Sequence, residues 1–296
     1  MRKLLDILLI FVKFCRHIVE FILFISVVII GNLIPFRASS WLFGMIFANL
    51  GIFLPPSHRI LNNLRFIYPL MDEIFVRSLT KKIWFNTGRF AGETPHFFFR
   101  SWRSLRKYVT LENEDILINY AQKKQSVIII LEHIGNWWFV GKFLSFHGIT
   151  AYAIYRKPNN PLINLVYKVD NNKKIAKGSL NMKQIITAIS AGSPISIFQD
   201  HRDGNGIPLP LLDKTAMTSV FFAKLATKYN LPVIGINCLR QPMRETKFTM
   251  KFSEIYHPDK DGKTSPEALA RIVNDHISRD IQQNKWQWFW LHRRWK

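Results

Sequence analysis

A histidine follows the apolar run SVIIIL, in the stretch LEHIGNWWFVGK at residues 131–142. A run rich in Ile and Val without alternation is typical of a parallel strand that is covered on both faces. His133 would then lie at the carboxyl end of this strand, where open α/β sheets bind their ligands. The position suits a general base, although a histidine that only fills a strand-to-helix turn would show the same pattern.

Three further polar stretches come at or soon after segments that look like strands. Parallel strands bring their carboxyl ends to one edge of a sheet, so we expect these stretches to meet His133 in one cleft. Arg, Lys, Asn and Asp around a histidine fit general-base chemistry on an anionic substrate. The candidate catalytic residues are His133, Arg156 and Asp200, and the candidate substrate-binding residues are Gly135, Asn136, Asn159, Asn160, Lys177, Gly178 and Arg202.

A second interpretation is open for several of these positions. Arg156 at a strand end and Lys177-Gly178 in a turn also fit a solvated surface. The sequence has no glycine-rich phosphate loop, no Gly-x-Ser-x-Gly elbow and no HExxH, which argues against nucleotide hydrolases, serine hydrolases and zincins. The 9 histidines are scattered and have no cysteine partners, so we expect no metal site and no cofactor.

The elements that must position these residues alternate between strand-like and helix-like patterns. Strand patterns occur at residues 126–133, 149–156, 194–200, 230–240 and 248–255, and helix patterns at 59–68, 71–99, 161–172, 181–192 and 215–230. A last helix begins at Ser265, which can cap it, with Pro266 suited to the first turn. The alternation predicts an α/β fold with a mainly parallel sheet flanked by helices.

The N-terminal region has the character of a membrane anchor. Residues 21–36 carry no charge, and counted from Ile18 the segment approaches the roughly 20 residues that a spanning helix needs. No small-residue cleavage site precedes Pro35, so we expect an uncleaved transmembrane helix rather than a signal peptide. A second uncharged stretch, residues 38–57, is expected to be a helix in the membrane interface, with a buried helix as the alternative.

Composition agrees with a membrane-bound protein. The apolar fraction is 48% with 24 Phe, yet the net charge is +21, and a chain both apolar and basic suits an anionic bilayer. No nucleic-acid-binding motif is present, so we expect no nucleic-acid partner. The only cysteines, Cys15 and Cys238, predict no disulfide framework. We therefore divide the chain into an anchor with an interfacial segment, residues 1–57, and a catalytic domain, residues 58–296.

Several motifs occur in an order and spacing that resemble one family. After the N-terminal anchor come NTGRFAGETPH, HIGNW, YRKPNNP, KG, FQDHRDGNGIPLPLL, AMTSVFFAKLATKYNLPVI and WFWLHRRWK. Together they resemble the late acyltransferases of lipid A biosynthesis, the lauroyl and myristoyl transferases of Gram-negative inner membranes. The resemblance implies a glycerolipid-acyltransferase-like fold and a single-pass inner-membrane protein with its catalytic domain on the cytoplasmic face.

The resemblance also implies a reaction. An acyl chain held as a thioester on acyl carrier protein passes to a hydroxyl of a lipid A precursor, and His133 takes the hydroxyl proton. Backbone N–H groups of Gly135-Asn136, or the Arg156 guanidinium, would stabilise the developing oxyanion. Acyl carrier protein is acidic and the acceptor carries phosphates, so Arg156, Lys177 and Arg202 are expected to attract both partners.

The sequence departs from the family motif at one position. The motif has an acid after His and four further residues, and Trp138 occupies that position here. Tryptophan cannot accept a hydrogen bond from the imidazole. Glu93, Asp200 or Asp203 could replace the acid through space, whereas Glu132 would point to the opposite face of the strand. Two alternatives therefore stay open: a catalytically weakened or silent relative that binds acyl carrier protein or anionic lipid, and a glycerophospholipid acyltransferase.

Overall fold

A computed structural model describes residues 2–155, 158–167, 173–176, 182–242, 245–262 and 264–295. The strands are β1 (Val109–Glu112), β2 (Ile128–Leu131), β3 (Tyr152–Tyr155), β4 (Lys173–Ala176), β5 (Ile195–Phe198), β6 (Ile207–Leu211), β7 (Lys214–Thr218), β8 (Val233–Arg240) and β9 (Phe248–Tyr256). The helices of the first third are α1 (Arg2–Leu33), α2 (Phe36–Leu50), α3 (Pro56–Ile67), α4 (Glu73–Phe99) and α5 (Trp102–Leu105). The later helices are α6 (Asp115–Gln122), α7 (Trp138–Phe146), α8 (Pro161–Tyr167), α9 (Met182–Ser190), α10 (Phe221–Tyr229), α11 (Pro258–Asp261) and α12 (Pro266–Gln283).

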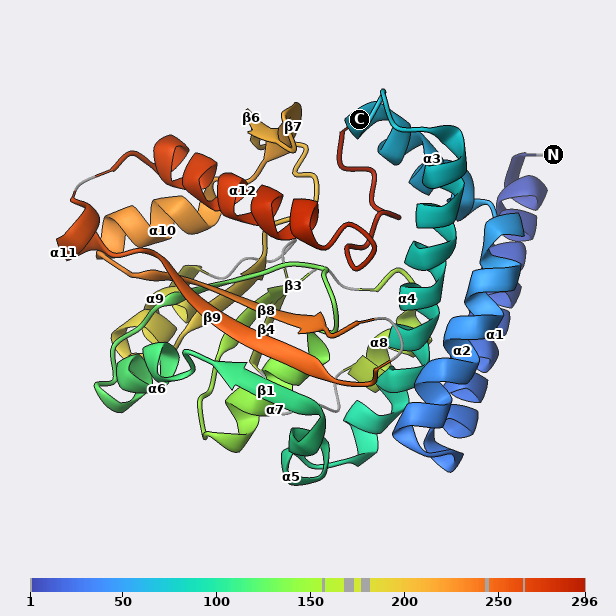
Figure 1. The fold of residues 1–296 in the computed structure, drawn as a ribbon, viewed down its shortest axis with the longest axis horizontal. Helices are drawn as coiled ribbons and strands as arrows, with labels where there is room; N and C mark the ends of the chain where they lie inside the picture. Colours follow the sequence, from blue (N-terminus) through green and yellow to red (C-terminus); the bar gives the residue numbers. More distant parts are fainter. Residues whose placement is uncertain are drawn as a thin grey trace.

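One sheet organises the molecule. Its strand order is β1-β9-β8-β2-β5-β3-β4, and the β6-β7 pair forms a separate hairpin. Neighbouring strands are parallel except β8 and β9, which run antiparallel. Helices cover both faces, with α10 and α12 on one side and α7 on the other (Figure 1). The predicted α/β fold with a mainly parallel sheet is therefore confirmed.

The central strand β2 is buried on both faces, as its sequence indicated. Ile128 and Ile130 pack in the core cluster that contains α10 and α12 residues, whereas Ile129 and Leu131 pack with α7 residues. Successive side chains of a strand point to opposite faces. The same alternation, continued past the end of β2, directs Glu132 towards α12 and His133 towards the α7 face.

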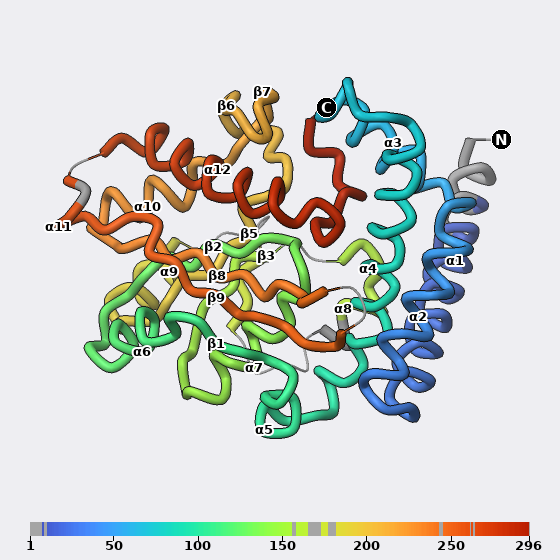
Figure 2. The backbone as a smooth tube through the Cα atoms, in the orientation of Figure 1, coloured from blue at the N-terminus to red at the C-terminus, as the bar shows by residue number. Residues whose placement is uncertain are grey.

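Helices α1, α2 and α4 run side by side along one flank of the sheet domain (Figures 1 and 2). A Cβ atom at Gly88 would lie 2.2 Å from Phe43 O, and one at Gly92 would lie 2.5 Å from Ser39 O. Only glycine leaves room for this approach of α2 to α4. Ser39 Oγ adds a hydrogen bond of 2.5 Å to Gly92 O.

Two segments of this flank are long and apolar enough to cross a membrane by length and composition, Phe11–Leu33 and Phe36–Phe53. Of the first, only 11% is buried, whereas 39% of the second is buried. The exposed apolar surface of α1 indicates association with a membrane, as the composition suggested. The helices differ in extent from the prediction, because α1 begins at Arg2 and the chain turns at Pro35, directly before α2.

The hairpin of β6 and β7 corrects one prediction. Residues 215–230 were expected to form one helix, but Thr215 to Thr218 belong to β7 and α10 begins only at Phe221. Leu212 and Asp213 connect the two strands with φ of 51° and 58°. Two positive-φ residues make the tight turn that suits a twisted hairpin, but neither residue is the Asn or Gly that usually signals it. Strands β1 and β4 were not predicted either.

Candidate active site

The loop after β2 is held in a defined shape by backbone contacts. Gly135 has φ of +60°, and a Cβ atom there would lie 2.0 Å from Cys238 O, so a glycine is required. Its N–H donates to Gln287 O at 3.2 Å, and the N–H of Asn136 donates to Cys238 O at 2.9 Å. These two amide groups hold the loop against β8 and the C-terminal segment. The oxyanion role suggested for them is therefore not supported.

His133 has a carboxylate partner from the neighbouring strand. Nδ1 of His133 lies 2.8 Å from Oδ1 of Asp200, and the His133 backbone N–H donates to Oδ2 at 2.7 Å. Sheet register explains the pair, because β2 and β5 are parallel with Leu131 opposite Phe198. His133 and Asp200 each come two residues after that matched pair. Of the three acids considered as replacements for the acid at Trp138, Asp200 is the one that contacts His133.

Asp200 is held as a carboxylate. Burial alone would raise its pKa, but the charge of His133 and hydrogen bonds from the His133 ring and backbone outweigh that effect, so the pKa lies well below its ordinary value. Trp288 Nε1 donates a further hydrogen bond to Oδ2 at 2.8 Å. An ionised carboxylate only accepts, so the proton of neutral His133 lies on Nδ1 and Nε2 keeps its lone pair. Such an imidazole is ready to act as a base.

Aromatic rings enclose the His133 side chain, whose exposed fraction is 21%. Phe198 stacks on it with ring centroids 4.1 Å apart, and Trp137 and His292 meet it edge-on at 5.0 and 4.7 Å. Burial lowers the pKa of His292 to about 3, with the charge of His133 acting in the same direction, so His292 is neutral. The rings fix the plane of the His133 imidazole without adding a second charge beside it.

A groove of about 490 Å³ opens at His133 and runs between the sheet and α7. His133, His201 and His292 lie together at one end, Lys174 and Ser196 line the groove beside Ala153, and the rest of the lining is mainly apolar. The apolar lining includes Leu131, Trp138, Val140, Leu144, Ala151, Ala153, Ile154 and Phe198. A volume of this order suits one small ligand or a flexible chain.

Trp138, at the position of the missing acid, belongs to the apolar wall of this groove. It is the first residue of α7, and its backbone N–H donates to Asn136 Oδ1 at 3.1 Å. Its indole packs against Phe97 and Phe98 of α4, with ring centroids 6.3 and 5.5 Å apart. Tryptophan therefore contributes apolar surface where the family motif has a carboxylate.

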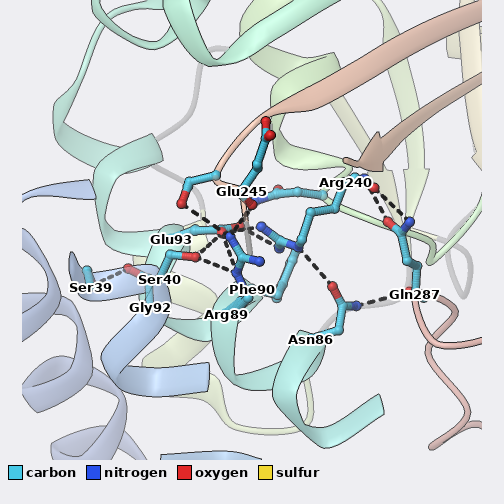
Figure 3. A network of polar contacts seen from close by, with 12 residues as sticks. Ser39, Ser40, Asn86, Arg89, Phe90, Gly92, Glu93, Arg240, Glu245 and Gln287 are labelled. Atoms are coloured by element: carbon cyan, nitrogen blue, oxygen red, sulfur yellow. Dashed lines mark hydrogen bonds and ion pairs between the residues drawn. The ribbon is translucent and has the colours of Figure 1, made fainter. Parts of the chain in front are cut away.

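Glu93 of α4 lies at the centre of a buried polar network (Figure 3). Its carboxylate accepts hydrogen bonds from Arg240, from Ser40 Oγ at 2.6 Å and from Asn136 Nδ2 at 2.7 Å. Burial would raise the pKa of Glu93, but the charges of Arg240 and Arg89 hold it below its ordinary value. Through Asn136 the network connects α2 and α4 to the loop that carries His133. Glu93 thus contacts the loop and not His133 itself.

The C-terminal segment, residues 286–295, packs against the loop that carries His133. Phe289 N donates to His133 O at 2.9 Å, and Gln287 bonds both the N and the O of Arg240. Trp288 and Trp290 have exposed fractions of 1% and 0%. The segment WQWFWLHRRWK is therefore packed into the molecule, and it is irregular rather than a strand. Sequence reasoning missed Trp288 and His292 as parts of the site, although the WFWLHRRWK motif contains both.

Of the other candidate site residues, Asn160 is placed differently from the prediction. Asn160 is buried away from the groove, where its Nδ2 donates to His17 O and Glu20 Oε2 of α1. Asn159 and Arg202 are exposed. Arg156, Lys177 and Gly178 lie outside the described residues, and their roles stay predictions.

Comparison with known proteins supports the same class of enzyme. A family model described as bacterial lipid A biosynthesis acyltransferase matches residues 9–296. No curated protein matches the chain. Among solved structures, the crystal structure of the 1-acyl-sn-glycerophosphate acyltransferase PlsC from Thermotoga maritima matches with a TM-score of 0.38 and 14% identity. That match covers 86% of this chain and 96% of the other, and at this TM-score it carries no information on the site.

Proposed function

Because the chain belongs to the bacterial lipid A biosynthesis acyltransferase family, we propose that it moves a fatty acyl chain from acyl carrier protein to a hydroxyl group of a lipid A precursor. His133 is the general base and Asp200 is the carboxylate that orients it. The observation that carries this proposal is the 2.8 Å contact between His133 Nδ1 and Asp200 Oδ1. If His133 had no carboxylate partner, the replacement of the motif acid by Trp138 would favour a catalytically silent relative.

The proton transfer follows from the assigned tautomer. Nε2 of His133 takes the proton of the acceptor hydroxyl while the oxygen attacks the thioester carbonyl carbon. The C–O bond forms and the carbonyl electrons move to oxygen, giving a tetrahedral oxyanion. As this collapses, the C–S bond breaks and the thiolate of the donor takes the proton from the imidazolium. The negative charge of Asp200 favours the imidazolium throughout the step.

The groove supports a long apolar acyl group. One end carries His133, and the lining that continues from it between the sheet and α7 is mainly apolar, with Lys174 and Ser196 as polar exceptions. An acyl chain that fills this groove brings its carbonyl carbon to His133. Burial of methylene groups contributes about 0.8 kcal/mol each, so the chain itself anchors the donor. Arg156, which follows a groove-lining residue, Tyr155, stays the candidate for the oxyanion.

The net charge of the chain and its apolar flank support the proposed partners and the proposed membrane location. A net charge of +21 favours the acidic acyl carrier protein and the phosphorylated acceptor. We propose that α1 anchors residues 1–57 in the inner membrane as a single span and that the catalytic domain, residues 58–296, lies on the cytoplasmic face. Helix α2 has one face packed on α4, so only its other face is available to lipid. This suits a helix in the interface.

The test is a transfer assay with purified full-length protein in detergent. The donor is acyl carrier protein that carries a radiolabelled acyl chain. The acceptor is a lipid A precursor or a lysophosphatidic acid. We expect acylation of the lipid A precursor and its loss in His133→Ala, with activity kept in the matched variant His58→Ala of an exposed histidine. Transfer only to the lysophosphatidic acid would instead identify a glycerophospholipid acyltransferase. Undiminished transfer by His133→Ala would remove His133 from the mechanism.

A further inference from the structure

A second cluster of ligand-type side chains lies on the face of the sheet opposite His133. It consists of Glu132, just after β2, and His276 and Asp280 on α12. One ligand atom from each residue lies within 4.8 Å of the others. His276 and Asp280 are four residues apart on one face of the helix, with Nε2 and Oδ2 3.5 Å apart. Nothing in the proposed acyl transfer uses these groups.

One carboxyl oxygen of Glu132 lacks the hydrogen-bond partner that a buried polar atom needs. The exposed fraction of Glu132 is 4%, and its Oε2 atom has no hydrogen-bond partner. Among the residues that the structure describes, no Lys or Arg forms an ion pair with Glu132 or Asp280. Two carboxyl groups brought together away from water are unfavourable unless a cation or a proton compensates them.

The surrounding backbone and side chains are built around the cluster. Asn237 lies beside Glu132 on the adjacent strand β8, and its Nδ2 donates to Asp280 Oδ2 at 2.7 Å. A Cβ atom on Gly235 would lie 2.9 Å from His276 Nε2, so the glycine leaves space for the imidazole against the sheet. An outer hydrogen bond that fixes a carboxylate, and a ring placed by close packing, are typical supports of a metal ligand.

We propose that Glu132, His276 and Asp280 bind one divalent transition-metal ion of the zinc type. One imidazole nitrogen and two carboxylate oxygens are ligands that Zn²⁺ prefers, and water would complete four-coordination. Two carboxylates neutralise the two positive charges of the ion, which removes the need to bury a net charge. The ion would tie α12 to the end of β2, one residue before His133. The sequence alone indicated no metal site, because the histidines are scattered and have no cysteine partners.

The test uses the full-length protein in detergent, freed of metal with a chelator and then titrated with ZnCl2 by calorimetry. We expect one ion per chain, and with Co²⁺ as the probe an absorption spectrum of a four-coordinate nitrogen and oxygen site. Glu132→Gln and His276→Gln should each weaken Zn²⁺ binding by more than the roughly 10–100-fold that loss of an outer partner costs. Glu132→Gln keeps the side-chain shape and removes one of two adjacent carboxylates, so the fold is retained.

Two controls make the result specific. Asp259→Asn changes the exposed pair in which His257 Nδ1 lies 3.9 Å from Asp259 Oδ2, and it should leave Zn²⁺ binding unchanged. His292→Gln changes the other group of ligand-type atoms, His133, Asp200 and His292, and should also leave it unchanged. The proposal is overturned if the wild type binds no Zn²⁺, which would mean that the carboxyl groups share a proton. It is also overturned if Glu132→Gln and His276→Gln bind as the wild type does.

Discussion

Asp200 accepts hydrogen bonds from both nitrogen atoms that His133 offers it, the backbone N at 2.7 Å and the ring Nδ1 at 2.8 Å. A single carboxylate therefore fixes the end of β2 and the tautomer of the base. In the mechanism proposed above, this arrangement takes the role of the acid that the family motif has at the position of Trp138. The partner comes from the neighbouring strand instead of the following helix.

Asp200→Asn should lower acyl transfer by about 10³–10⁴-fold, as loss of an orienting carboxylate does in triad enzymes. Oδ2 of Asp200 accepts from two fixed donors, His133 N and Trp288 Nε1. The asparagine oxygen must take that place, so its NH2 group faces Nδ1 and moves the imidazole proton to Nε2. The rate of a single turnover measures the effect. Asp203→Asn is the matched control, and a similar loss in that variant would argue against the specific role of Asp200.

Trp138→Glu should lower acyl transfer, not restore it. Asp200 already orients His133, and a carboxylate at position 138 would lie in the apolar wall formed with Phe97 and Phe98. Placing a charge there costs folding free energy and acyl binding. Trp138→Phe keeps the apolar wall and should transfer nearly as well as the wild type. Turnover measured on the three proteins side by side decides the matter, and higher turnover in Trp138→Glu would mean that Asp200 orients the base poorly.

Glu93→Gln should destabilise the protein by about 3–5 kcal/mol, the cost of breaking one side of a buried ion pair. The change leaves Arg240 and Arg89 with an uncompensated buried charge, since both face the Glu93 carboxylate. Denaturant unfolding in detergent gives the difference. Glu73→Gln, at an exposed ion pair with Arg65 and Arg77, should change the free energy of unfolding little, because solvent screens that pair. Equal effects in the two variants would show that the buried network contributes little.

The pKa of His292, lowered to about 3 by burial, links stability to pH. The pKa of this histidine in the unfolded state is about 6.5. Between pH 6.5 and 3 the unfolded state therefore binds one proton that the folded state does not bind. This contribution to stability is therefore complete above pH 6.5 and falls as the pH is lowered, by at most about 1.4 kcal/mol per unit. His292→Asn should flatten unfolding free energy against pH in that window, whereas His58→Asn should not. Parallel curves for the wild type and His292→Asn would contradict the assignment.

The sequence was sufficient for strands β2, β3, β5, β8 and β9 and for the position of His133 after β2, because these depend on local pattern, whereas the edge strands β1 and β4 were missed. β2, β5 and β8 are apolar runs, and the end of a buried strand is visible as the first polar residue. The partner of His133 was left among several acids, since only the β2-β5 register decides which aspartate meets it. Asn160 was misplaced for a similar reason. Its contact is with α1, far away in the chain, and no local pattern reports such a contact.

Two truncated chains distinguish the roles of α1 and α2. Removing residues 1–33 takes away a helix that is mostly exposed and leaves α2 on α4, so we expect a folded protein that loses its firm membrane attachment. Removing residues 1–58 also uncovers Gly88 and Gly92, which contact α2 through its backbone, and removes Ser40 from Glu93. That chain should unfold at a clearly lower temperature and lose transfer, because the loop of His133 is tied to Glu93 through Asn136. Thermal unfolding and membrane sedimentation at high salt test both statements. Equal stability of the two truncated chains would show that α2 belongs with the anchor alone and not with the catalytic domain.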